Sequence, residues 1–115
     1  MTIQAFYAVT GGNYEEAQTR LMNEVLVKKF ATRYASDPSY SDLEMALSVD
    51  DTQTAFRAAH TMKGVCMNLA FSRLAASASH ITELLRSGNL SDAKTYFPNV
   101  KNDYEAVMAA LAQLD

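Results

Sequence analysis

The chain has 115 residues, of which 49% are apolar and 20% charged, and its net charge is −3. This length supports one domain with its own core, and the composition is ordinary for a globular protein. The charge balance gives no basic surface of the kind that nucleic acid requires, and no apolar run approaches the roughly 20 residues of a membrane span.

Few residues in the sequence interrupt helices, since there are only 4 Gly and 2 Pro. No segment alternates apolar and polar residues as a half-buried strand does, so we expect an all-α fold. We find no internal repeat, low-complexity tract or linker, and we expect a single domain over residues 1–115. The lone Cys66 allows no intramolecular disulfide, and the first residues lack the pattern of a signal peptide. We therefore expect a cytoplasmic protein.

The first residues predict two short helices. One runs from Thr2 to Thr10 and ends at Gly11-Gly12. Its apolar face consists of Ile3, Phe6 and Tyr7. The second helix begins at Asn13, whose side chain is expected to cap it together with Glu16 in a capping box, and it ends near Arg20.

A third helix is expected from Asn23, with Met22 packing against its start, to Asp37-Pro38. It ends there because the residue before a proline avoids helical geometry. Its apolar stripe is expected at Leu26, Phe30 and Tyr34. A short apolar face then follows at Leu43, Ala46, Leu47 and Val49. We expect these two pieces to form one bent arm of a helical bundle.

The stretch from Ala55 to Leu69 predicts the central helix, which acidic Asp50-Asp51 would open. Its apolar stripe consists of Ala55, Ala58, Ala59, Met62, Val65, Cys66 and Leu69. At about 100° per residue, His60 lies roughly 200° from Met62 and faces outward. Lys63 and Gly64 follow one turn later on the same face. A glycine inside a helix costs about 1 kcal/mol relative to alanine, so Gly64 requires a reason.

Two further helices complete the chain. Ser72 is expected to cap the first, and Gly88 to close it. The stripe of that helix is Leu74, Ala78, Ile81 and Leu85. Ser91 is expected to cap the last helix, in which Pro98 would produce a kink or a break. The seam of the last helix is Ala93, Phe97, Val100, Tyr104, Val107, Leu111 and Leu114. Short loops predict an antiparallel up-down four-helix bundle with one or two short N-terminal capping helices.

The outward face of the central helix carries the residues with the most distinctive chemistry. Imidazole has an ordinary pKa of about 6.5, so a histidine is mainly neutral and nucleophilic near neutral pH. Lys63 lies where its ammonium could stabilise a phosphoryl group on His60, and Gly64 leaves the approach to the ring open. Phe56 and Met67 on the same face favour a docking patch. Taken singly, each of these residues would be an ordinary surface residue.

The segment His60-Thr61-Met62-Lys63-Gly64 resembles the His-x-x-Lys-Gly signature of histidine-containing phosphotransfer (HPt) domains. The resemblance extends from about Asn13 onward. Further matching bundle positions are Phe30, Tyr34, Leu43, Ala46-Leu47, Asp50 or Asp51, Ala59, Leu69 and Leu74. The chain departs from the family at Ala70, where glycine is usual, at Ile81-Thr82, where Leu-Glu is frequent, and at Met62, where leucine is usual.

The resemblance implies that His60 accepts a phosphoryl group, at Nε2, from an aspartyl phosphate on a receiver domain and passes it to another receiver. Lys63 would then stabilise the phosphoryl charge. Phe56, Arg57, Gly64 and Met67 would dock receivers of a hybrid histidine kinase or of response regulators. The resemblance also implies that the domain holds no cofactor or metal, since Mg²⁺ belongs to the receiver. We expect a monomer with no nucleic-acid or membrane partner.

Other sites are less well supported by the residues. His80 has Glu83 and Leu84 beside it, which would repel and obstruct a phosphoryl group. Cys66 lies in the apolar stripe and is expected to be a core residue. Neither histidine has the glutamate three residues earlier that a metal-binding bundle uses. The absence of a phosphate-binding glycine loop excludes an autonomous kinase. A bundle that docks a receiver or another partner without phosphotransfer remains the alternative.

Overall fold

The computed structural model describes residues 1–115, and all of its regular structure is helical. The helices are α1 (Ile3–Thr10), α2 (Tyr14–Leu21), α3 (Glu24–Arg33), the single-turn 3₁₀ helix η1 (Tyr34–Ser36), α4 (Ser39–Ser48), α5 (Thr52–Asn68), α6 (Ser72–Arg86) and α7 (Leu90–Leu111). The predicted all-α fold class is therefore confirmed. No helix combines the length and the apolar composition that crossing a membrane would require.

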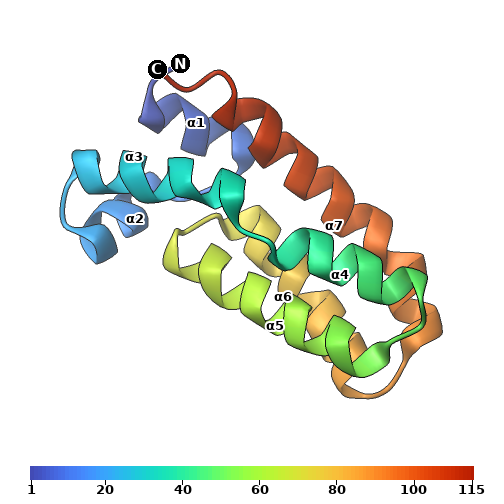
Figure 1. Cartoon of the computed structure of the whole chain (residues 1–115). Coiled ribbons are helices and arrows are strands. Elements are labelled where there is room, and N and C mark those ends of the chain that lie inside the picture. Colours follow the sequence, from blue (N-terminus) through green and yellow to red (C-terminus); the bar gives the residue numbers. More distant parts are fainter.

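Four helices pack in the order in which they follow along the chain. Helix α4 packs against α5, α5 against α6 and α6 against α7, and α7 in turn contacts α4. The chain reverses its direction from each of these helices to the next (Figure 1). Since α4 and α6 are the main neighbours of α5, the remaining side of α5 is left to solvent. This uncovered side is the setting of the candidate site.

The apolar stripe of α5 is buried as predicted. Its members Ala55, Ala58, Ala59, Met62, Cys66 and Leu69 are all buried, while Val65 is half-buried. Alanines at the contacts let neighbouring helices approach closely, and Met62 fills the space between them with no exposed surface. Full burial of such a side chain stabilises the fold by about 1.5–3 kcal/mol. The stripe therefore fixes the rotation of α5 about its axis.

The three short N-terminal helices gather at one end of the bundle, around the turn between α5 and α6 (Figure 1). The Tyr7 hydroxyl donates to the Leu69 carbonyl at 2.7 Å, and the Asn13 amide donates to the Ala70 carbonyl at 2.9 Å. Gly12 is required beside this contact, because a Cβ there would lie 2.7 Å from the Tyr7 ring. The end of α5 is thus held by segments that precede it by more than 50 residues in the sequence.

Of the stripe predicted for α3, only Tyr34 is buried as expected. The buried side chains are Val27, Ala31 and Tyr34, whereas Leu26 and Phe30 are only half-buried. Helix α3 packs on α1 and α2 at the end of the molecule, while α4 packs on α5. The two pieces of the expected bent arm therefore face different neighbours, and this changes which face of α3 is buried.

Several predicted helix ends were also wrong. Ser72 is the first residue of α6 and forms no cap, and the cap of α7 is Asn89, whose side chain accepts from the Asp92 amide at 3.2 Å, rather than Ser91. Helix α7 is continuous through Pro98, so the break predicted there as one possibility is wrong. In contrast, Asn13 and Asp51 cap α2 and α5 as predicted.

Two apolar residues expected to pack are exposed. Met22 is 80% exposed, and Val49, just after α4, is 65% exposed. Met22 ends α2 with a φ of 81°, a conformation that a side chain disfavours. Because its side chain contributes little packing, its main effect on stability is this strain.

We expect Met22→Gly to raise the free energy of unfolding by about 0.5–1 kcal/mol, because relief of strain exceeds the added flexibility of the unfolded chain. Urea denaturation followed by circular dichroism measures this change. The control is Gln18→Gly, at an exposed position inside α2, which should lower stability by about 1 kcal/mol. A loss of stability in both variants would contradict the strain at position 22.

Candidate functional site

His60 is exposed on the uncovered side of α5, as the spacing predicted. Its imidazole stacks on the ring of Phe56, one turn earlier, with 5.9 Å between ring centroids and 12° between ring planes. Phe56 is half-buried and packs against the core. The phenyl ring therefore supports one face of the imidazole and leaves the remainder of the histidine open to a partner.

Arg86, from the last turn of α6, joins this pair. Its guanidinium carbon lies 4.9 Å from the centroid of the Phe56 ring, and its Nε lies 3.1 Å from a Glu83 carboxylate oxygen. Cation–π contacts of this kind contribute about 0.5–1 kcal/mol at exposed sites. The sequence analysis missed Arg86, because its approach to Phe56 depends on how α5 and α6 pack side by side. The Phe56 ring thus contacts both the His60 imidazole and the Arg86 guanidinium.

Lys63 and Gly64 lie one turn beyond His60 on the same face. Lys63 is half-buried and forms no ion pair with any carboxylate of the chain. Its ammonium is therefore available to an anion on the histidine. Gly64 is exposed, and a Cβ at this position would meet no atom within 4 Å. Packing within the chain thus does not require glycine here, and the surface beside His60 carries no side chain at this position.

The far end of the face is formed by Met67, which is 47% exposed. Its backbone carbonyl accepts a hydrogen bond from Arg20 of α2, and Arg20 forms an ion pair with Glu16 at 2.7 Å. Arg57 is exposed as well, but it lies on the side of α5 that turns toward α4. The structure thus brings Phe56, His60, Lys63, Gly64 and Met67 onto one surface, with Arg57 at its margin.

The alternative sites considered in the sequence, at His80, at Cys66 and at a metal centre, were also located in the structure. His80 is exposed and packs against Tyr96 of α7, with 4.2 Å between the ring centroids. Cys66 is fully buried, its thiol lies 3.7 Å from the Tyr34 hydroxyl, and burial raises the pKa of this thiol to about 12. A thiol that stays protonated is a poor nucleophile. No three His, Cys, Asp or Glu side chains lie close enough together to hold a metal ion.

Two of the departures from the family pattern have structural counterparts. Ala70 is buried and has a φ of 55°, the left-handed conformation that glycine adopts without strain. The chain therefore keeps the turn between α5 and α6 although it lacks the usual glycine. Thr82 is fully buried, and its hydroxyl donates to the Ala78 carbonyl at 2.6 Å. It is satisfied within α6 and presents no charge to the surface.

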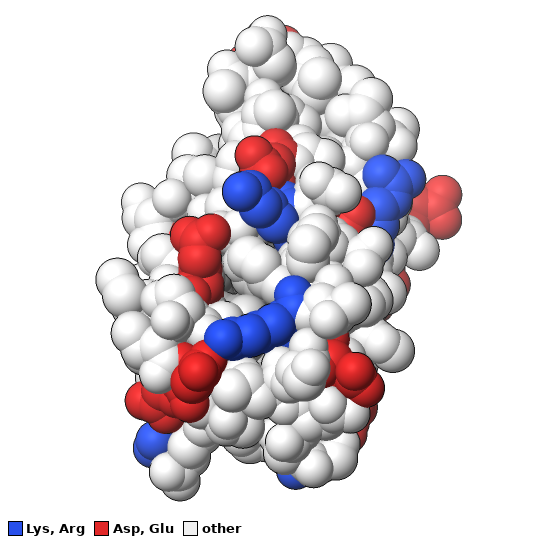
Figure 2. All heavy atoms as spheres, turned by 90° about the vertical axis from the view of Figure 1, so that its right-hand side faces the viewer, with Lys and Arg blue, Asp and Glu red and all other residues white.

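The charges on the surface are mixed rather than separated. Figure 2 shows basic and acidic side chains side by side on one face of the molecule. Nucleic-acid binding requires a coherent basic patch, which this face does not have.

The comparison with protein families identifies the class of domain. A family model described as Hpt domain matches residues 36–110, which contain α4 to α6, nearly all of α7 and the whole candidate site. The chain therefore belongs to the Hpt domain family, and the resemblance noted in the sequence is confirmed. Hpt domains have a phosphotransfer role in two-component systems and interact with receiver domains of kinases and response regulators. No curated protein and no solved structure matches the chain.

The contact between Phe56 and Arg86 is tested by a double-mutant cycle in urea denaturation. We expect Phe56→Ala, Arg86→Ala and the double variant to give a coupling energy of about 0.5–1 kcal/mol. The matched cycle pairs Phe56 with Arg57, which is next in sequence but forms no cation–π contact with that ring, and should give a value near zero. Equal coupling in both cycles would show that Arg86 does not interact specifically with the ring.

Proposed function

We propose that the protein is a phosphorelay intermediate in which His60 is the phosphoacceptor. His60 takes a phosphoryl group from an aspartyl phosphate on one receiver domain and transfers it to the aspartate of another. The observation that carries this proposal is the combination of an exposed His60, an unpaired Lys63 and an open Gly64 on one face of α5. Membership of the Hpt domain family supports it.

The chemistry requires little more than a positioned nucleophile. The lone pair on Nε2 of the neutral imidazole forms a bond to phosphorus as the bond from phosphorus to the aspartate oxygen breaks, and the electron pair returns to the carboxylate. Transfer to the next receiver reverses these steps. Phosphoryl transfer depends mainly on positioning and charge stabilisation. Phe56 would position the ring, and Lys63, assisted by Arg86, would stabilise the charge of the phosphoryl oxygens.

The docking surface in this proposal consists of Phe56, Arg57, Gly64 and Met67. The partners are receivers of a hybrid histidine kinase, of response regulators or of both, with no nucleic acid or membrane involved. The chain itself holds no cofactor, and Mg²⁺ is expected in the receiver. We further propose that residues 1–115 act as a single, monomeric domain in the cytoplasm, with α4 to α7 as an antiparallel up-down four-helix bundle.

The phosphoacceptor is tested by incubating the protein with a receiver that carries a radiolabelled aspartyl phosphate. We expect the wild type and His80→Gln to take up label, and His60→Gln to take up none. Both substitutions change an exposed histidine, so they should leave the helical circular dichroism spectrum unchanged. Label on His60→Gln would disprove the assignment. A wild type that binds receivers without labelling would instead establish the non-catalytic adaptor.

The open approach at Gly64 is tested by a series of side chains of increasing size. Because a Cβ there has free space, Gly64→Ala and Gly64→Leu should both fold, and Ala should raise the free energy of unfolding by about 1 kcal/mol. In a calorimetric titration with a receiver, we expect Ala to bind nearly as the wild type and Leu to bind at least about tenfold more weakly, a loss of about 1.4 kcal/mol. Normal affinity of the leucine variant would refute the docking role of Gly64.

A further inference from the structure

The exposed face of α5 is too small to bind a receiver alone. Its 17 residues form a strip about 25 Å long and about 10 Å wide, or roughly 250 Å². A stable protein interface covers about 800 Å² on each partner. A receiver that reaches His60 must therefore extend over α4 or α6 as well. This inference rests on the proposed function and concerns the side toward α4.

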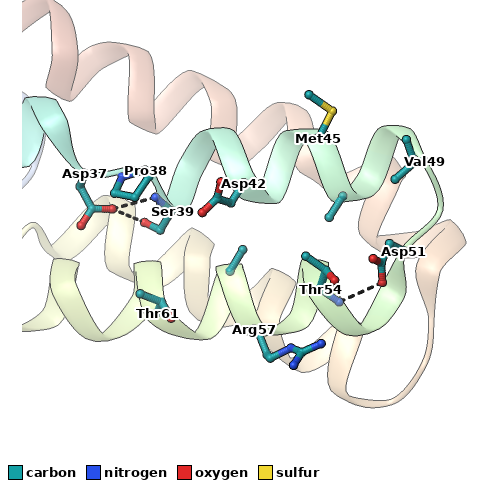
Figure 3. A pocket seen from close by; sticks show the side chains of 12 residues that line it. Asp37, Pro38, Ser39, Asp42, Met45, Val49, Asp51, Thr54, Arg57 and Thr61 are labelled. Atoms are coloured by element: carbon teal, nitrogen blue, oxygen red, sulfur yellow. Dashed lines mark hydrogen bonds between the residues drawn. The ribbon is translucent and has the colours of Figure 1, made fainter.

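A groove of about 420 Å³ runs between α4 and α5 on that side (Figure 3). Each helix contributes an alanine to the lining, Ala46 from α4 and Ala58 from α5, and such short side chains fill little of the space between the helices. Two large apolar residues line it from α4 and its end, and both are unusually exposed. They are Met45, at 66%, and Val49, at 65%.

The charges that line the groove are mainly negative. Asp37, Asp42 and Asp51 line it together with a single cation, Arg57, whose side chain extends from α5 away from α4 (Figure 3). Asp37 accepts hydrogen bonds from the amide and hydroxyl of Ser39, and Asp51 accepts one from the Thr54 amide at 3.1 Å. These donors are neutral, so they leave both negative charges in place. The Asp42 carboxylate has no hydrogen-bond or ion-pair partner and points from α4 toward α5 (Figure 3).

The groove is continuous with the face around His60. Arg57 and Thr61 line it, and they directly follow Phe56 and His60 in the sequence. Adjacent residues of a helix are about 100° apart around its axis, so the groove begins beside the histidine. Any partner centred on the imidazole would have its margin over this groove.

We infer that the α4–α5 groove is a specificity-determining part of the receiver footprint. It accepts an apolar side chain of the receiver between Met45 and Val49, flanked by a lysine or arginine that pairs with Asp42. The groove thereby favours receivers with a basic residue at the margin of their docking surface. His60 then exchanges the phosphoryl group with the receiver that is bound.

The test measures transfer to the protein from purified receivers of the source organism, each phosphorylated beforehand with acetyl phosphate. The receiver that labels the wild type fastest is the probe. We expect Asp42→Lys to raise the receiver concentration for half-maximal transfer at least tenfold, with Asp42→Asn intermediate and the rate at saturation unchanged. The control is Glu44→Lys, with the same charge change on the same helix but outside the groove, which should stay within twofold of the wild type.

The apolar lining is tested in the same assay. We expect Met45→Ala to raise the receiver concentration for half-maximal transfer at least threefold. Met22→Ala, at an exposed methionine far from the groove in sequence, should leave that concentration unchanged. The role of the groove would be overturned if Asp42→Lys had the same half-maximal concentration as Glu44→Lys and Met45→Ala the same as Met22→Ala. Failure of the proposed function is distinct, because the wild type would then take up no label from any receiver.

Discussion

The structure depends on the burial of one face of α5 between α4 and α6. Ala55, Ala59, Met62 and Cys66 have no exposed surface, and together they fix both the position and the rotation of the helix. A rotation of about 100° would expose one of these side chains and bury a polar one, and both changes are unfavourable. His60 is therefore presented to solvent by the core itself, and the chemistry of the site requires no strained backbone around the histidine.

The surroundings of His60 suit a residue that holds a phosphoryl group for a short time. An exposed phosphohistidine carries close to two negative charges, and exposed ion pairs are weak because water screens them. Lys63 and Arg86 could therefore stabilise the product modestly without trapping it. Arg86 is already paired with Glu83 and packed on Phe56, so its position is fixed without a bound partner. Such an arrangement is consistent with a carrier that must both accept and release its load.

The sequence was a good guide where a helix packs on its neighbours in the chain, and a poor one elsewhere. Every residue predicted in the stripes of α5 and α6 is buried except half-buried Val65, because each helix buries a face with helical periodicity. The buried face of α6 is wider than predicted and also includes Ala75, Ser77 and Thr82. In α3, the stripe was wrong because the helix packs on α1 and α2 at the end of the molecule. The cap predicted at Ser91 was wrong because Asn89, two residues earlier, caps α7. Ser72 was wrong because it is already inside α6, which no side chain caps.

The sequence by itself determined the all-α class, the central helix and the outward position of His60, Lys63 and Gly64, since these follow from the period of a single helix. Only the tertiary structure decided that Arg86 reaches Phe56, that the N-terminal helices hold the end of α5, and that a groove opens beside His60. These features depend on how close two helices lie and where they face one another. That geometry arises from packing between residues far apart in the chain, which no local pattern records.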